Sequence, residues 1–208
     1  SPGMSTAECL LRDDLRAFAG YRSARSDVLR GEVWLNANES PSVSPADVEG
    51  LLRRYPEPQP QALREALAAL YGVDPAQLLA TRGSDEGIDL LLRAFCVPGH
   101  GAIVIAPPVF GMYAVCAKLH GARVVEVAAQ DTADGWRSDL DAMADAALRE
   151  AATLVFVCNP GNPTGEPIAV GDIERLARRL HGKALLVVDA AYAEFADAGD
   201  GASLLAGH

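Results

Sequence analysis

From about residue 78 onward, short apolar runs alternate with longer segments in which apolar residues recur at helical spacing. The apolar runs lie near residues 78–81, 102–106, 123–127, 153–157 and 184–188, and the helical segments near 84–95, 110–120, 140–148 and 168–180. Continuous apolar strands alternating with helices are typical of a mostly parallel sheet with helices on both faces. The sequence therefore predicts an α/β fold, whose ligands bind beyond the carboxyl ends of the strands.

The residues before this alternation follow other patterns. Residues 6–19 carry apolar side chains at helical spacing and predict an amphipathic arm helix. Residues 36–45 are rich in Asn, Ser and Pro and predict a loop, and the three prolines within residues 55–60 predict a rigid extended connector. A helix is predicted over residues 61–71, ending at Gly72. We divide the chain into residues 1–3, typical of a remnant of expression cloning, an arm and loop over 4–50, and the α/β part over 51–208.

Composition excludes several classes of function. The chain has 208 residues, 50% of them hydrophobic and 22% charged, which argues against disorder. Its formal net charge of −10, without a basic run, argues against nucleic acid or an anionic membrane as partner. We see no signal peptide and no apolar run long enough to span a membrane, so we expect a cytoplasmic protein.

Cysteines and histidines give no sign of a metal site. Cys9, Cys96, Cys116 and Cys158 form no C-x-x-C pair, and three of them lie in apolar segments. The four histidines are scattered. We therefore expect free thiols in a reducing compartment and no metal.

Residues that could bind a ligand follow successive strands. After the first apolar run, Ser84, Asp85 and Glu86 open a helix, where free backbone N–H groups and a hydroxyl can hold a phosphate. Simple helix capping by the same residues is the alternative. Phe110 follows the second run and could lie flat on a planar ring or cover the core. Asn162 lies in a rigid Pro- and Gly-rich turn after the fourth, where its amide could face a ligand.

The fifth run ends directly at Asp189, and Tyr192 follows three residues later. A carboxylate at the end of a buried strand is costly unless something compensates it. A protonated pyridine nitrogen is one such partner, and a helix cap or a buried salt bridge is the alternative. Together, the residues after these strands are those that a single pyridoxal-phosphate site requires.

Five segments of the chain resemble the fold-type I, pyridoxal-phosphate-dependent aminotransferases. They read L-N-A-N-E at 35–39, R-Y-P-E-P-Q at 54–59, R-G-S-D-E-G at 82–87, N-P-T-G at 162–165 and D-A-A-Y at 189–192. The first two, together with residues 87–95, are similar specifically to histidinol-phosphate aminotransferases. The resemblance covers residues 21–195 or so and implies the large domain of that fold, preceded by an N-terminal arm.

The resemblance also implies roles for single residues. Those expected to bind pyridoxal 5'-phosphate are Ser84, Asp85 and Glu86 at its phosphate, Phe110 stacked on its ring, Asn162 and Tyr192 at the ring hydroxyl, and Asp189 at the ring nitrogen. Tyr55 would reach the cofactor phosphate of a partner subunit, which implies a homodimer, and Tyr21 would approach the substrate phosphate across the same interface.

The chain departs from the family pattern at three points. Phe110 stands where the family usually has Tyr, so a hydroxyl contact is lost, and Ala190 stands where it usually has Glu. The Schiff-base lysine is expected some tens of residues after the D-x-A-Y motif, whereas the only lysines here are Lys118 and Lys183. We therefore expect residues 51–208 to be a partial large domain with unpaired strand edges, the small domain to be absent, and the chain to be an inactive fragment.

The resemblance implies amino-group transfer between L-histidinol phosphate and 2-oxoglutarate, which becomes glutamate, in histidine biosynthesis. Within the same fold, an aromatic aminotransferase or a threonine-phosphate decarboxylase is the alternative. Outside it, the alternative is a non-catalytic α/β domain that binds phosphate ligands.

Overall fold

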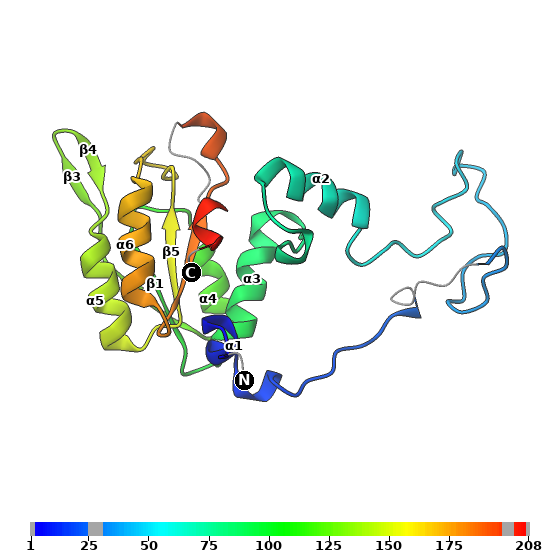
Figure 1. Cartoon of the computed structure of the whole chain (residues 1–208), viewed down its shortest axis with the longest axis horizontal. Coiled ribbons are helices and arrows are strands. Elements are labelled where there is room, and N and C mark those ends of the chain that lie inside the picture. Colours follow the sequence, from blue (N-terminus) through cyan, green and yellow to red (C-terminus); the bar gives the residue numbers. More distant parts are fainter. Residues whose placement is uncertain (1–2, 25–30, 197–201, 207–208) are drawn as a thin grey trace. The chain divides into compact units, whose positions relative to one another are not determined.

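The computed structural model describes residues 3–24, 31–196 and 202–206. Ser1 and Pro2, part of the segment assigned to cloning, lie outside the described residues. The chain divides into two compact units (Figure 1): one combines Ser1–Ala17 with Thr81–His208, and the other is Phe18–Ala80.

The first unit contains a four-stranded sheet whose strands are all parallel. Its strands are β1 (Ala102–Ile105), β2 (Arg123–Glu126), β5 (Leu154–Cys158) and β6 (Leu185–Asp189), in the spatial order β2-β1-β5-β6. Four of the five predicted strands are thus confirmed, each to within about one residue. The chain moves outward from β1 to β2 and then crosses β1 to reach β5 and β6, so the order reverses between β1 and β5. In such a sheet, ligands bind near this reversal, at the carboxyl ends of the strands.

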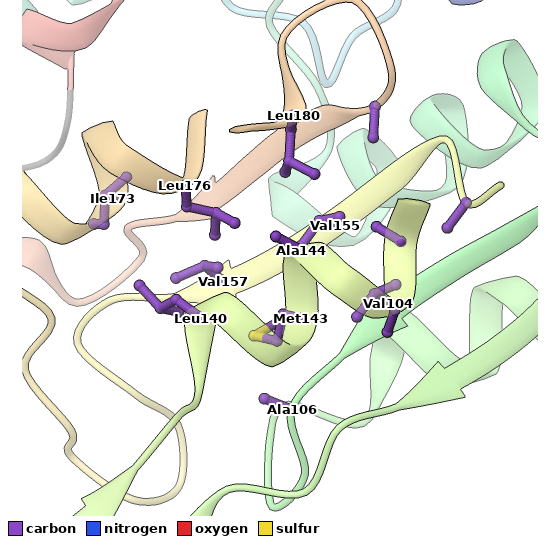
Figure 2. Close-up of a cluster of buried hydrophobic side chains, with 14 of the residues drawn as sticks. Val104, Ala106, Leu140, Met143, Ala144, Val155, Val157, Ile173, Leu176 and Leu180 are labelled. Atoms are coloured by element: carbon purple, nitrogen blue, oxygen red, sulfur yellow. The ribbon is translucent and has the colours of Figure 1, made fainter. Parts of the chain in front are cut away.

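Four helices cover the two faces of this sheet. Helices α3 (Gly83–Phe95) and α4 (Met112–His120) pack on one face, and α5 (Leu140–Glu150) and α6 (Val170–Leu180) on the other. Successive strand residues alternate between two buried clusters, as the pleat requires: Ile103 packs with α3 and α4, whereas Val104 packs with α5 and α6. Figure 2 shows the second cluster, in which Met143 and Leu176 face the strands. The predicted α/β class, with helices on both faces, is confirmed.

A two-stranded antiparallel hairpin of β3 (Gln130–Thr132) and β4 (Gly135–Arg137) was not predicted. Its strands are short and mostly polar, so they give no apolar run in the sequence. Gly135 adopts a φ of 106° after the turn, which favours glycine. After β6, the first unit has two short 3-10 helices, η4 (Ala193–Phe195) and η5 (Ala202–Ala206).

The predicted arm helix over residues 6–19 is too long. The structure has α1 (Thr6–Leu10) and a separate 3-10 helix, η1 (Asp13–Leu15). Arg12, between them, is extended: its backbone N–H donates to the Ala94 carbonyl at 3.0 Å and its guanidinium to the Arg93 carbonyl at 3.0 Å. Those carbonyls belong to the last turn of α3 and have no partner within the helix, so capping them interrupts the arm helix.

In the Phe18–Ala80 unit, α2 (Gln61–Tyr71) has the predicted bounds, and Gly72 ends it in the left-handed conformation with a φ of 66°. A 3-10 helix, η3 (Pro75–Gln77), follows. Residues 36–45 and 55–60 contain no helix or strand, as predicted.

The strand predicted at residues 78–81 is wrong. Leu78 is extended, but the segment joins no sheet among the described residues. Its backbone pairs instead with the side-chain amide of Gln59, which donates to the Ala80 carbonyl at 2.8 Å and accepts from the Ala80 N–H at 2.7 Å. An amide side chain carries the same donor and acceptor as a peptide group, so here it takes the place of a neighbouring strand.

Candidate functional site

Asp189 lies at the carboxyl end of β6, beside the end of β5. It is in register with Cys158, and the Asn159 N–H donates to the Asp189 carbonyl at 2.9 Å. Its half-buried side chain accepts two hydrogen bonds, from the Tyr113 hydroxyl to Oδ2 at 2.6 Å and from the Ala191 N–H to Oδ1 at 3.1 Å. Within the described part of the chain, no Lys, Arg or His pairs with this carboxylate.

The buried salt bridge weighed for Asp189 is therefore not formed among these residues. Its carboxylate has about four lone-pair sites, of which two neutral donors use two. The remaining sites suit a cationic partner, which the described residues do not supply. The Asp189 carboxylate can therefore accept a further hydrogen bond from a protonated ring nitrogen.

Tyr113, which donates to this carboxylate, packs against two other aromatic rings. The Tyr113 ring stacks on Phe156 with the centroids 4.7 Å apart, and Phe110 meets its edge at 5.6 Å. Burial, together with the hydrogen bond to Asp189, holds the pKa of the Tyr113 phenol far above its ordinary value. Phe110 is half-buried.

The turn that carries Asn162 is held at both ends. Asn159, buried after β5, donates to the Ile168 carbonyl at 3.0 Å and accepts from the Ile168 N–H at 2.9 Å. The Glu166 carboxylate accepts from the Ser138 N–H at 2.6 Å and the Ser138 hydroxyl at 2.7 Å. Asn162 itself is half-buried, at the same edge of the sheet as Asp189.

The first turn of α3 lies at this edge too. In Figure 1, β5 points away from α1, and α1 precedes Arg12, which caps the last turn of α3. Ser84 and Asp85 are exposed, and no side chain caps the N-terminus of this helix. The Gly83 N–H donates to the Thr81 carbonyl at 2.9 Å, so the N–H groups of Ser84 and Asp85 are the ones available to an anion. Glu86 forms an ion pair with Arg82, one turn back in the chain.

The tyrosines singled out from the sequence are more exposed. Tyr192 follows β6 and is 48% exposed, with its ring 6.3 Å from Phe195. Tyr55 and Tyr21 belong to the Phe18–Ala80 unit, and both are exposed. Their contacts across a dimer interface stay predictions.

Neither lysine lies at this edge. Lys118 is exposed in the last turn of α4, and Lys183 is exposed just before the amino end of β6, opposite Asp189.

No three His, Cys, Asp or Glu side chains gather as a possible metal site in the described residues. No described helix is long and apolar enough to cross a membrane. Of the four free thiols, Cys9 is exposed and the other three are buried.

Sequence reasoning missed Tyr113, Cys158, Asn159 and Glu166 as parts of the site. Tyr113 follows Phe110 by three residues, and that spacing was the available signal. The pairing of Asn159 with Ile168 and of Glu166 with Ser138 closes a loop, and a linear pattern does not reveal such contacts.

Comparison with known proteins matches residues 25–206 to the family "Aminotransferase class I and II". The matched residues include Asp189 at the end of the edge strand β6, Phe110 with its ring against Tyr113, and the start of α3. The chain belongs to the class I and II aminotransferases.

Within this family, the chain is similar to histidinol-phosphate aminotransferases. It is 62% identical to the one from Stenotrophomonas maltophilia, over 96% of this chain and 55% of the relative, and 57% identical to the one from Xanthomonas euvesicatoria, over 94% and 54%. The crystal structure of the Sinorhizobium meliloti enzyme with pyridoxal 5'-phosphate superposes with a TM-score of 0.64 at 30% identity, over 71% of this chain and 39% of that one. The chain thus spans about half the length of the curated relatives it matches.

Proposed function

We propose that this chain is part of a pyridoxal-phosphate-dependent enzyme that transfers an amino group between L-histidinol phosphate and 2-oxoglutarate in histidine biosynthesis. The observation that carries the cofactor assignment is the Asp189 carboxylate, which has two neutral donors and no cation among the described residues. Similarity to histidinol-phosphate aminotransferases supports the substrates.

Pyridoxal phosphate supplies an electron sink for the substrate's α-carbon when it is bound. Residues of the first unit would hold it: Asp189 at the ring nitrogen, Phe110 against the ring, Asn162 and Tyr192 at the ring hydroxyl, and Ser84, Asp85 and Glu86 at the phosphate. The first turn of α3 suits the phosphate because the N–H groups of Ser84 and Asp85 are uncapped. Phe110 offers a ring face without a hydroxyl.

The assembly proposed is a cytoplasmic homodimer. In it, Tyr55 would reach the partner subunit's cofactor phosphate, and Tyr21 the substrate phosphate. The Glu39 carboxylate supports a fixed Tyr55 backbone, since it accepts from the Tyr55 N–H at 2.9 Å and the Arg54 guanidinium at 2.6 Å.

The test is amino transfer by the protein expressed from the complete open reading frame that encodes these residues. With pyridoxal phosphate and 2-oxoglutarate, L-histidinol phosphate should yield glutamate, whereas L-phenylalanine and threonine phosphate should yield little. Replacing Asp189 by Asn should lower the rate by about 100-fold or more, because a neutral amide no longer compensates the ring nitrogen's charge. Equal rates for Asp189→Asn and the unaltered protein would contradict the assignment.

Intact mass tests the lysines separately. After the 208-residue chain is mixed with pyridoxal phosphate and reduced with borohydride, we expect no single stoichiometric adduct. The reason is that Lys118 and Lys183 both lie away from the Asp189 edge. A specific adduct on either lysine would overturn the proposed site.

A further inference from the structure

Tyr113 is a fully buried side chain whose hydroxyl meets Asp189 across the core. Its O–H donates to Asp189 Oδ2 at 2.6 Å, although 76 residues separate the two in sequence. This distance is short for an O–H donor and is typical of a hydrogen bond to an ionised oxygen. The position of the Asp189 carboxylate therefore depends on α4 as well as on β6.

The Tyr113 ring is held in one orientation. Phe156 of β5 stacks on it with an interplanar angle of 19°, and Phe110 meets it edge-on at 85°. Packed rings of this kind cannot swing, so the hydroxyl is aimed before any ligand arrives. The raised pKa of the phenol, caused first by its burial, keeps the hydroxyl protonated and therefore a donor at every working pH.

No other side chain among the described residues orients the Asp189 carboxylate as Tyr113 does. The Ala191 N–H holds Oδ1 at 3.1 Å from the strand's own end. Cys158 lies beside Asp189 in register, with its thiol next to the Tyr113 hydroxyl. Among the described residues, Tyr113 is the one side chain that donates a hydrogen bond to the Asp189 carboxylate.

We propose that Tyr113 is a positioning residue, which fixes the Asp189 carboxylate so that its free lone pairs face the cofactor's ring nitrogen. This inference rests on the proposed function, because it assumes that Asp189 pairs with that nitrogen. Tyr113 also touches Phe110, the residue proposed to stack on the ring. One phenol thereby links the carboxylate and the stacking residue.

The test replaces Tyr113 by Phe in the holoenzyme expressed from the complete reading frame, with Tyr71→Phe as control. Tyr71 ends α2 in the other unit and has no hydrogen bond through its hydroxyl among the described residues. The probe is pyridoxal 5'-phosphate labelled with ¹⁵N in its ring, whose resonance differs strongly between the protonated and the neutral nitrogen.

In Tyr113→Phe, we expect the dissociation constant of the cofactor to rise about tenfold. At saturation, the ring ¹⁵N resonance should move toward its neutral position and its titration to lower pH, because a released carboxylate stabilises the protonated nitrogen less well. A purely structural role would change the melting temperature but not the ¹⁵N resonance at saturation. Tyr71→Phe should change neither the resonance nor the dissociation constant.

An unchanged resonance and titration in folded, saturated Tyr113→Phe would overturn the positioning role while leaving the proposed function intact. If the unaltered protein binds no pyridoxal phosphate, the positioning role and the proposed function are both wrong. Should Tyr113→Phe not fold, 3-fluorotyrosine at position 113 keeps the shape and makes the phenol a stronger donor. The ¹⁵N resonance or its titration must then differ from that of the unaltered protein, and no difference overturns the inference.

Discussion

Different interactions stabilise the interior of each of the two units. The sheet of the first unit is almost wholly buried along β1 and β5, between two layers of helices. In the Phe18–Ala80 unit, only Asp47 and Ala68 are buried among the described residues. Apolar burial therefore stabilises the first unit, whereas the second depends on hydrogen bonds between side chains and backbone.

Three acceptors illustrate the second kind of stabilisation. Asp47 accepts from the N–H groups of Leu51 and Leu52, at 3.2 and 2.7 Å. The carboxylate of Glu39 and the amide of Gln59 hold chain segments 16 and 21 residues away. Each contact orders a loop without an apolar core, so each loop depends on one or two side chains.

The largest expected effect is in the first unit. Leu154 is fully buried in β5, and Leu154→Ala should lower the free energy of unfolding of this unit by about 2–5 kcal/mol, because a cavity is left in a packed core. The control is Leu119→Ala on α4, where the side chain is 82% exposed, with an expected change within about 0.5 kcal/mol.

Each unit contains one of the two tryptophans, so urea unfolding can be followed separately. Trp34→Phe leaves Trp136 to report the first unit, and Trp136→Phe leaves Trp34 to report the second. If Leu154→Ala moved both transitions equally, the two units would unfold together and the contrast between them would be broken.

A smaller effect is expected for Glu39→Ala, which removes the acceptor for both Arg54 and the Tyr55 N–H. The Glu39 side chain is only 2% exposed, so the lost partner leaves polar groups poorly satisfied, at about 1–3 kcal/mol. Fluorescence of Trp34 in urea measures it, with the exposed Glu49→Ala as control. A shift of the Trp136 transition instead would mean that Glu39→Ala destabilises the first unit, which contradicts the prediction.

The smallest effect is expected for Gln59→Ala. It removes the two hydrogen bonds to Ala80, each with a net value of about 0.5–1.5 kcal/mol. Hydrogen exchange at the Ala80 amide should quicken, while Gln61→Ala, which loses an exposed contact with Glu65, should leave it unchanged. Unchanged exchange in Gln59→Ala would mean that the extended segment needs no substitute for a strand neighbour.

The sequence predicts the first unit better than the second because apolar periodicity reports burial. The sheet and its four helices were found to within a few residues, and Asp189, Phe110 and Asn162 lie at the expected edge. Contacts between polar groups leave no periodic signal. The sequence therefore did not reveal that Arg12 interrupts the arm helix or that Gln59 takes the place of a neighbouring strand. It also did not reveal the contact of Tyr113, because the position of its hydroxyl is fixed only when α4 packs against β5.

The spatial order β2-β1-β5-β6 has a consequence for how the chain is made. β1 is complete at Ile105, but its second neighbour, β5, begins only at Leu154. During synthesis from the N-terminus, β1 therefore keeps one edge of unpaired N–H and C=O groups until β5 has emerged from the ribosome. For that interval, the most apolar part of the sheet is also the part that most needs protection from other nascent chains.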